Sequence, residues 1–483
     1  MPNLLDNVPE SSAEADGLVR TYMKMFESTH RILHIPSFWT EYREFWRDKP
    51  KAAPEFVAQL LLIMAAGLLL QFRSPDSFDL NKDSVARRQT AVRWVHAVER
   101  WLSHQQRPDL TLIRIHCLLI LAKRANAIDL DMIWTSVGTL VRLAMTMGLH
   151  RDPDYLQNIS LFHAECRRRL WATVLELDLQ ASMERGMPVM IGNEDYDCCP
   201  PLNINDWDVM ESTEAAQSRP SGVTETSFQV ALLRSLPVRL EIAKLINSLV
   251  PDPPYEEILR LDKEMTQCLQ DIPHSLKIET NSKEHIEAGL SLPKQLLDLH
   301  IRRFLLLLHV PFAVQAGSNP RYSYSRHVCL ENASVMLSHC KAFPDTTELR
   351  ALLFKDEHVQ AAVSICFELF INRPNAGKPP STTATTTTAV CTHIIPLQAW
   401  AYQRKCTTSS ATRHWHWWRA HCSCLRSESA SWAKASRTSS SFRWWRRLSK
   451  PRSRPSAPRG ICASRRTGVP RSAQHCRCTI LSG

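Results

Sequence analysis

The stretch that decides the fold runs LAMTMGLHRDP at 143–153 and is followed by ECRRRLW at 165–171. The first stretch closes an apolar helix, because Gly148 tolerates the positive φ that ends a helix. The second opens a helix whose apolar positions continue until Gly186 and Pro188 stop it. Two long helices on either side of a short polar link indicate a helical protein.

The segments around this stretch have the same character. Residues 111–125 and 131–147 are apolar helices joined by a few residues, so they should pack as an antiparallel hairpin. No strand alternation appears, and glycine is scarce at 13 residues. The fold prediction is all-α: a multi-helix regulatory domain of antiparallel helical hairpins over 17–372, with a motif-rich core at 118–208 and a disordered N-terminus at 1–16. Further helices are expected at 18–46 with a break at Pro36, from Pro54 for about 18 residues, and at 86–105, 228–249, 256–269, 292–312, 324–342 and 351–372.

Export and membrane insertion are not indicated. The first residues, MPNLLDNVPE, have no basic stretch that leads into an apolar core and a cleavage site. The uninterrupted apolar run at 60–70 is about half the roughly 20 residues that span a bilayer, so we expect a buried helix and no membrane partner. Most of the 15 cysteines should then be free thiols.

The charge divides sharply along the chain. From 375 onward, 19 lysines and arginines stand against one acidic residue, so the net charge of +11 consists of +18 in this tail and −7 in the rest. The region 373–483 is a low-complexity Ser, Arg, Trp and Cys tail, either disordered and basic or an artefact of out-of-frame or unspliced translation. Within it, RWWRRLSKPRSR is a candidate nuclear-localisation patch, with basic residues Arg443, Arg446, Arg447, Lys450, Arg452 and Arg454.

The order of motifs in the core resembles one known family. GLHRD at 148–152, RRRLW at 167–171, a helical Asp178, GMP at 186–188 and the loop DYDCCPPLNINDWD at 195–208 stand in this order. The same order is similar to that in the middle homology region of fungal zinc-cluster transcription factors, called the fungal-specific transcription factor domain. HRILHIPSF at 30–38 and LLLHVPF at 306–312 extend the resemblance over about 17–372. The motif residues, expected to be structural or regulatory, are Gly148, His150, Arg151, Asp152, Arg167, Arg168, Arg169, Trp171, Asp178, Gly186 and Pro188.

Two positions depart from the family pattern. Met187 stands where an arginine is usual between glycine and proline, and Ala172 stands where a second tryptophan usually follows Trp171. Neither departure breaks the helical pattern, so both bear on local packing or regulation and not on membership of the family.

The resemblance implies a nuclear regulator of RNA polymerase II transcription, with a metabolic or secondary-metabolite gene cluster as one kind of target. Its partners would be the transcription machinery or co-regulators, a second copy in a homodimer and a small-molecule effector.

No Cys-x-x-Cys occurs in the 483 residues, so the six-cysteine zinc cluster of the family is absent from them. We therefore expect no cofactor in this chain, zinc only in an upstream cluster, and DNA contact only through a missing domain or a partner. The alternative is a non-DNA-binding interaction protein that modulates a full-length transcription factor.

The residues themselves favour clamps over ligand or DNA contacts. The three arginines of 167–169 point over more than half of the helix circumference, so they cannot share one partner, and Asp178, Asp195 and Asp197 are candidates for some of them. His150 is expected to cap carbonyl groups left open after Gly148. Since the sequence has no nucleophile elbow, zinc-protease motif, phosphate loop or dinucleotide fingerprint, we expect no enzyme and no catalytic residue; an all-α enzyme such as a terpene cyclase is the less favoured alternative.

Overall fold

The structure is a computed structural model that describes residues 4–68, 80–105, 107–215, 222–249, 253–276, 291–339, 360–366 and 368. Within these ranges every regular element is a helix, so the all-α prediction is confirmed. The helices are α1 (Ser12–Tyr22), α2 (Ser28–His30), α3 (Ile35–Arg47), α4 (Pro54–Leu68), α5 (Leu80–Leu102), α6 (Leu110–Ala125), α7 (Ile133–Thr146), α8 (Leu161–Arg185), α9 (Ser227–Arg234), α10 (Leu236–Asn247), α11 (Tyr255–Gln270), α12 (Ser291–Ala313) and α13 (Ser323–Ser338).

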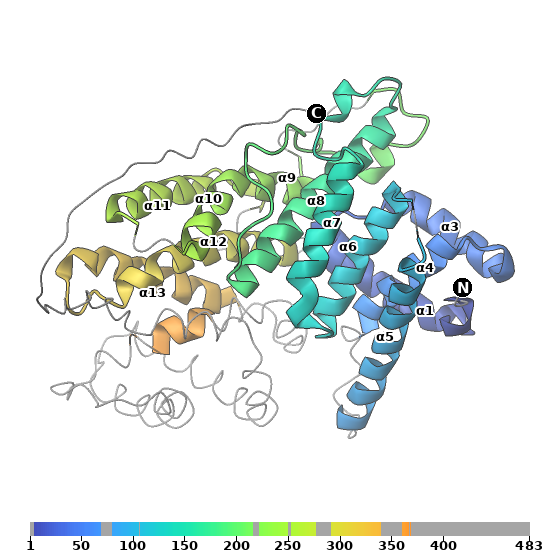
Figure 1. Cartoon of the computed structure of the whole chain (residues 1–483), viewed down its shortest axis with the longest axis horizontal. Coiled ribbons are helices and arrows are strands. Elements are labelled where there is room, and N and C mark those ends of the chain that lie inside the picture. Colours follow the sequence, from blue (N-terminus) through green and yellow to red (C-terminus); the bar gives the residue numbers. More distant parts are fainter. Residues whose placement is uncertain are drawn as a thin grey trace, which may run out of the picture.

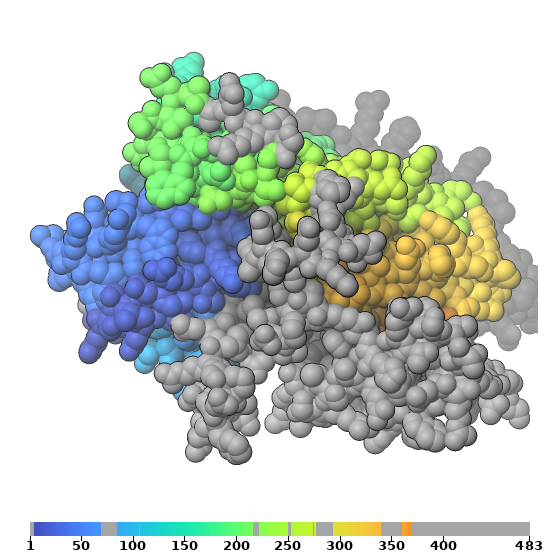
Figure 2. Space-filling view, turned by 180° about the vertical axis from the view of Figure 1, so that it is seen from behind, coloured from blue at the N-terminus to red at the C-terminus, as the bar shows by residue number. Residues whose placement is uncertain are grey.

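The helices form two groups that meet along α8 (Figure 1). In the first group α4 packs against α1, α5 and α6, and α7 packs between α6 and α8. In the second group α12 packs against α9, α10, α11 and α13. The segments between α8 and α11 run along the top of the molecule from one group to the other (Figure 2). Helix α8 therefore contributes to both groups, because it also contacts α9 and α10.

The most apolar helix, α4, lies at the centre of the first group. Its residues from Leu60 to Ala66 are fully buried, as expected for a core helix. Gly67 is required there because a Cβ atom at this position would collide with the backbone carbonyl of Leu18 on α1. No helix among the described residues is both long enough and apolar enough to cross a membrane.

The prediction of a disordered N-terminus at 1–16 is wrong for the residues that the structure describes. A 3₁₀ helix spans Leu4–Asn7, and α1 begins at Ser12 after Ser11, whose hydroxyl accepts from the amide of Ala13. Burial of Leu4 and Ala15 and a 2.7 Å hydrogen bond from the Trp94 indole to the Asn7 carbonyl supply the contacts that hold this segment. Residues 1–16 contain few apolar side chains, so their sequence alone does not predict these contacts.

Some helix boundaries agree with the predictions and others differ. The break expected near Pro36 is present: the helical segment ends at His30, and α3 begins at Ile35 with Pro36 in its first turn, where its missing N–H costs nothing. The expected helix 228–249 is two helices, because a turn at Ser235 separates α9 from α10. Of the expected helix 351–372, only 360–366 and 368 lie within the described residues, and they are helical.

Helix ends at glycine were predicted correctly. Gly148 has φ +68° and follows α7, and the amide of Leu149 donates to the Ala144 carbonyl across the end of the helix. Gly186 has φ +63° and ends α8. Both glycines of the core motifs are therefore explained by backbone conformation.

Candidate functional site

The three arginines at 167–169 lie in the first half of α8, and Arg168 forms a buried clamp. Its guanidinium lies 2.7 Å from Asp152 Oδ1, 2.7 Å from Asp154 Oδ1 and 2.9 Å from Glu165 Oε1. The other oxygens of these carboxylates accept backbone amides from the loop after α8: Asp152 Oδ2 from Cys199 at 2.7 Å and Glu165 Oε2 from Leu202 at 2.9 Å. Arg168 thus fastens two surface loops to α8.

The charges of this cluster stabilise one another. Burial opposes ionisation of Asp152, but the Arg168 guanidinium and the amides of Asp154 and Cys199 hold the pKa of that carboxyl well below its usual range. The same carboxylates raise the pKa of Arg168 further above its usual value despite the cost of burial. The Asp152 carboxyl and the Arg168 guanidinium are therefore both ionised at neutral pH, and the guanidinium is fully occupied by carboxylates within the fold.

A second buried cluster is centred on Asp206, in the short 3₁₀ helix Asp206–Asp208. Arg169 Nη1 lies 2.6 Å from Asp206 Oδ1, and Arg31 contacts the same oxygen. Asp206 Oδ2 accepts the amide of Ile35 at 2.8 Å. Burial opposes ionisation of Asp206, yet the two guanidinium groups hold its pKa below the usual range. One carboxylate thus connects α8, the start of α3 and the loop at 192–215.

The backbone around Arg31 is arranged for this contact. Arg31 has φ +44°, a left-handed conformation that costs a non-glycine residue about 1–2 kcal/mol. Just before it, the buried carboxylate of Glu27 accepts the Tyr22 hydroxyl at 2.8 Å and the amides of Ile32 and Leu33 at 3.0 and 3.1 Å. Burial raises the pKa of Glu27 to about 7. The motif HRILH is therefore a tight turn held by side chains on both sides.

The predicted partners for the arginines were wrong. Among the described residues, Arg168 and Arg169 form ion pairs with Asp152, Asp154, Glu165 and Asp206 and not with Asp178, Asp195 or Asp197, because helix α8 turns each arginine toward a different neighbour. Arg167 donates to the Met147 carbonyl at 2.7 Å, at the end of α7. Asp197 instead pairs with Arg151 at 2.9 Å on the surface, and Asp195 accepts the amide of Gly192.

His150 does not cap the end of α7 as expected. Its own carbonyl accepts the amides of Asp197 and Cys198, at 3.1 and 3.2 Å, and its buried Nδ1 has no hydrogen-bond partner. Its ring centroid lies 6.3 Å from that of Trp171, which is almost fully buried. His150 therefore serves as an apolar neighbour of Trp171 and as a backbone anchor for the loop.

Asp178 holds the segment that follows α8. Its Oδ2 accepts the amide of Met190 at 2.8 Å, and its Oδ1 is buried without a partner. Burial raises the pKa of Asp178 to about 6. The Pro188 carbonyl accepts the Ser182 hydroxyl at 3.1 Å and the Trp134 indole at 3.3 Å. The GMP turn is thus tied to α7 and α8.

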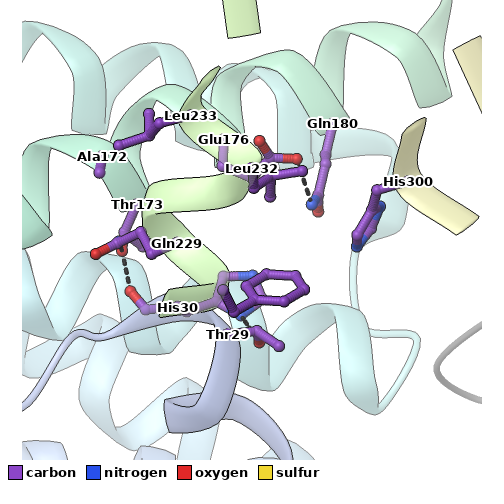
Figure 3. Close-up of a pocket in the computed structure, with 11 residues that line it drawn as sticks. Thr29, His30, Ala172, Thr173, Glu176, Gln180, Gln229, Leu232, Leu233 and His300 are labelled. Atoms are coloured by element: carbon purple, nitrogen blue, oxygen red, sulfur yellow. Dashed lines mark hydrogen bonds between the residues drawn. The ribbon is translucent and has the colours of Figure 1, made fainter. Parts of the chain in front are cut away.

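A small cavity lies where the two helix groups meet (Figure 3). Ala172, Thr173, Glu176 and Gln180 of α8 line it together with Thr29, His30, Phe228, Gln229, Leu232, Leu233 and His300. It offers about 20 Å³ to the centre of a water molecule, which suits one water. Glu176 is held there by Arg239 at 2.8 Å, and burial together with Arg124 lowers the pKa of His30 to about 4. An organic effector needs a pocket of roughly 300–1,000 Å³, so this cavity is too small for one.

A serine, a histidine and an aspartate meet in the second helix group. His309 of α12 lies 3.0 Å from Asp262 Oδ1 and 2.9 Å from the Ser325 hydroxyl, which also contacts the Tyr255 hydroxyl at 2.8 Å. The spacing matches that of a hydrolase triad, but Ser325 is 0% exposed, so no substrate carbonyl can reach it. The arrangement joins α11, α12 and α13 and gives LLLHVPF a structural role.

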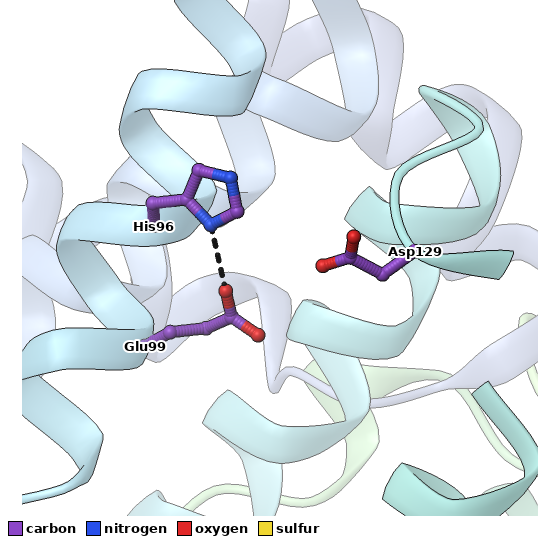
Figure 4. Close-up of side chains that lie close together, drawn as sticks. All are labelled: His96, Glu99 and Asp129. Carbon is purple, nitrogen blue, oxygen red and sulfur yellow. Dashed lines mark hydrogen bonds and ion pairs between the residues drawn. The ribbon is translucent and has the colours of Figure 1, made fainter. Parts of the chain in front are cut away.

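One group of side chains has metal-ligand chemistry. His96 and Glu99 of α5 and Asp129 bring ligand atoms within 4.8 Å of one another (Figure 4). The buried ammonium group of Lys123, however, contacts Glu99 and lies 3.3 Å from Asp129. A dication there would be repelled by this lysine, so we interpret the group as an ion-pair network around Lys123.

The tail and its nuclear-localisation patch lie outside the described residues, as do the histidines and cysteines near 414–424. The described cysteines are all free thiols, at positions 117, 166, 198, 199, 268, 329 and 366. Apart from the adjacent Cys198 and Cys199 they lie on different elements, so within the described part of the chain they do not form the six-thiolate arrangement of zinc-cluster proteins.

The sequence and structure agree with what comparison with known proteins shows. The family described as "Fungal specific transcription factor domain" matches residues 19–269, which is more than half of the chain and includes both arginine clusters. The chain belongs to this family. No solved structure matches the chain.

Curated relatives in this family are named transcription factors. "Transcription factor lepE" of Aspergillus flavus is 36% identical over 377 residues, which cover 76% of this chain and 44% of that protein. "Transcription factor opdR" of Penicillium oxalicum is 36% identical over 348 residues, covering 70% and 43%. The "Aspyridones cluster regulator apdR" of Emericella nidulans is 31% identical over 300 residues, covering 61% and 40%. The chain therefore spans less than half of the length of these relatives.

The sequence interpretation missed several residues on which this fold rests. Arg31, His34 and Asp206 lie in motifs that by themselves assign them no role, and Glu27 and Arg239 lie outside the motifs. A charged residue inside an apolar stretch, such as the arginine in HRILHIP, was the available signal, because such a charge requires a buried partner.

Proposed function

We propose that this chain is the regulatory region of a fungal transcription regulator that acts in the nucleus on genes read by RNA polymerase II. Membership of the family supports this function, as do the names of the relatives. The observation that carries the proposal is that the family motifs form the two buried arginine clusters around α8. These clusters build a rigid platform and leave no reactive centre.

A biosynthetic gene cluster is the target that best fits this proposal. The relative from Emericella nidulans is named as the regulator of such a cluster. We propose metabolic or secondary-metabolite gene clusters as a class of target and not one particular gene cluster.

Promoter contact would come from a separate domain or a partner protein. Residues 1–374 carry a net charge of −7, which repels a phosphate backbone, and Arg168 and Arg169 of the core are paired with carboxylates inside the fold. The partners of this region would then be co-regulators or the transcription machinery, with a second copy of the chain as a further partner. The same acidic charge favours the second candidate, an interaction protein that modulates a full-length transcription factor without binding DNA.

A tethering experiment tests the proposed function. The full chain is fused to a heterologous DNA-binding domain in a fungal host that carries a reporter behind the matching operators. We expect the fusion to change reporter transcription at least threefold relative to the DNA-binding domain alone. Asp206→Asn should abolish the change because it breaks the second cluster, whereas Glu211→Gln, an exposed change in the same loop, should preserve it.

Equal reporter levels for the fusion and the isolated DNA-binding domain would contradict the proposed regulatory role. The two candidate functions are separated by the genomic sequence upstream of Met1. An in-frame exon rich in cysteine and lysine supports a regulator with its own zinc cluster, and closely spaced stop codons support the modulating interaction protein.

A further inference from the structure

An open groove lies between the N-terminal segment and α5, on the side of the molecule where Figure 1 places α1, α5 and the N-terminus. Its volume of about 740 Å³ is in the range that binds small organic ligands, roughly 300–1,000 Å³. It is separate from the small cavity at α8. Its lining includes the apolar residues Ala13, Leu18, Leu68 and Trp94.

The floor of the groove is apolar and firmly held. Leu18 and Trp94 are each 4% exposed, and Leu68 at the end of α4 adjoins them. The Trp94 indole donates to the Asn7 carbonyl, and the ammonium group of Lys49 donates to the carbonyls of Pro9 and Glu10 at 3.2 and 3.0 Å. The N-terminal segment is thus fixed from two sides, and the groove is preformed.

The two walls of the groove carry opposite charges. The N-terminal segment and α1 contribute Asp6, Glu10 and Glu14, and α5 contributes Arg87 and Arg93. Glu10, Glu14 and Arg93 are exposed, and their side chains form no ion pair with another described residue. Unpaired opposite charges across an apolar floor are suited to a ligand that carries both charges.

We propose that this groove binds a small zwitterion with an apolar body, namely an apolar amino acid or a short apolar peptide. The carboxylate of the ligand is placed toward Arg93, its ammonium group toward Glu10 and Glu14, and its apolar part on Leu18, Leu68 and Trp94. This site is distinct from the motif clusters and does not depend on the proposed function in transcription.

Ligands of other charge types match the groove less well. An anion would face Glu10 and Glu14 of the acidic wall, and a cation would face Arg93 of the basic wall. A neutral apolar compound would displace water from the charged side chains and would offer them no hydrogen bond or opposite charge in its place. Only a zwitterion compensates both walls while it covers the floor.

Isothermal titration calorimetry of the full chain tests the site. L-phenylalanine and L-leucyl-L-phenylalanine serve as probes, and the singly charged analogues 3-phenylpropionate and phenethylamine serve as matched controls. We expect at least one of the two zwitterions to bind saturably at about one per chain, and both singly charged analogues to bind at least tenfold more weakly. The probe that binds more tightly distinguishes a free amino acid from a peptide ligand.

Variants locate the binding to the groove. Arg93→Gln and Glu14→Gln should each weaken binding of the zwitterion at least tenfold, and Ala13→Phe should block it by filling the groove from an exposed position. Arg100→Gln on the same helix and Glu44→Gln on α3 lie outside the groove and should leave binding unchanged. Circular dichroism and melting temperature check that each variant is folded.

The proposal is overturned if neither zwitterion binds saturably. It is also overturned if the singly charged analogues bind equally well, or if all folded groove variants bind as the parent chain does. None of these results bears on the reporter experiment, so the groove and the regulatory function fail or succeed independently.

Discussion

Arg169 on α8 and Asp206 in the following loop form an ion pair of 2.6 Å whose side chains are 4% and 0% exposed. Thirty-seven residues separate them, and the same carboxylate also contacts Arg31, which precedes α3. Removing charges from water is costly unless each finds a partner, so these three side chains depend on one another. The first consequence is an uneven response to mutation along this loop.

Asp206→Asn should strongly destabilise the protein. The substitution leaves the buried Arg169 guanidinium without its counter-charge and leaves Arg31 with Glu225 at 3.7 Å, a loss for which about 3 kcal/mol is typical. Urea denaturation followed by circular dichroism measures the change in the free energy of unfolding. Glu211→Gln, exposed in the same loop, should change it by less than about 0.5 kcal/mol. Similar values for the two variants would show that the Asp206 cluster contributes no stability.

Asp178→Asn should stabilise the protein at neutral pH. Burial raises the pKa of Asp178 to about 6 in the folded state, above its unfolded value, so the folded state binds a proton more readily. Stability contributed by this group is present at low pH and is lost as the pH rises through about 6. An uncharged asparagine avoids that loss, for a gain of about 2 kcal/mol at pH 7.5.

The pH dependence distinguishes this explanation from a general effect of the substitution. The gain from Asp178→Asn should shrink as the pH falls toward 4, because Asp178 is then protonated in the native protein. Asp271→Asn, at an exposed position after α11, should show no such trend. Unfolding curves at several pH values provide the measurement, and a variant that is less stable at pH 7.5 would refute the role assigned to burial.

Ser325→Ala should lower the stability of the protein, and we expect no hydrolase activity that depends on Ser325. The hydroxyl joins His309 and Tyr255 in a buried network, and its removal leaves polar atoms unsatisfied at a cost of about 1–2 kcal/mol. Ser323→Ala, whose hydroxyl only contacts the Pro320 carbonyl at the surface, is the matched control. Thermal unfolding measures both. Turnover of an activated ester that Ser325→Ala abolishes in the folded protein would contradict the structural role.

Residues 1–374 should bind duplex DNA no better than an acidic control protein of similar size. Their net charge is −7, and Arg168 and Arg169 are occupied by carboxylates within the fold. Fluorescence anisotropy with a labelled duplex at several salt concentrations measures the affinity. Nanomolar binding that weakens steeply with salt would show that this region contacts phosphates directly.

The fold class could be predicted from sequence because its signals are local. The helices at 54–68, 110–125 and 133–146 follow from apolar runs, and Gly148 and Gly186 mark helix ends through their backbone freedom. The N-terminal segment escaped prediction because its order comes from contacts with distant residues, such as the bond from Trp94 to Asn7. Its own sequence is polar and gives no helical period.

The arginine clusters could be predicted only in part from the sequence. The three arginines of 167–169 were correctly expected to have different partners, yet the partners depended on how the loops return to α8. Asp152 lies 16 residues before Arg168 and Asp206 lies 37 residues after Arg169, and no sequence pattern distinguishes these two aspartates from Asp195 or Asp197. Pairing of buried charges across loops is a tertiary property, so it required the structure.

A double-mutant cycle between Arg169 and Asp206 tests most directly whether the family motif is an internal clamp. The free energy of unfolding is measured for the parent chain, Arg169→Gln, Asp206→Asn and the double variant. The account predicts a coupling energy of about 2 kcal/mol or more, because the two charges compensate each other away from water. Additive single effects, with a coupling energy below about 0.5 kcal/mol, would contradict it.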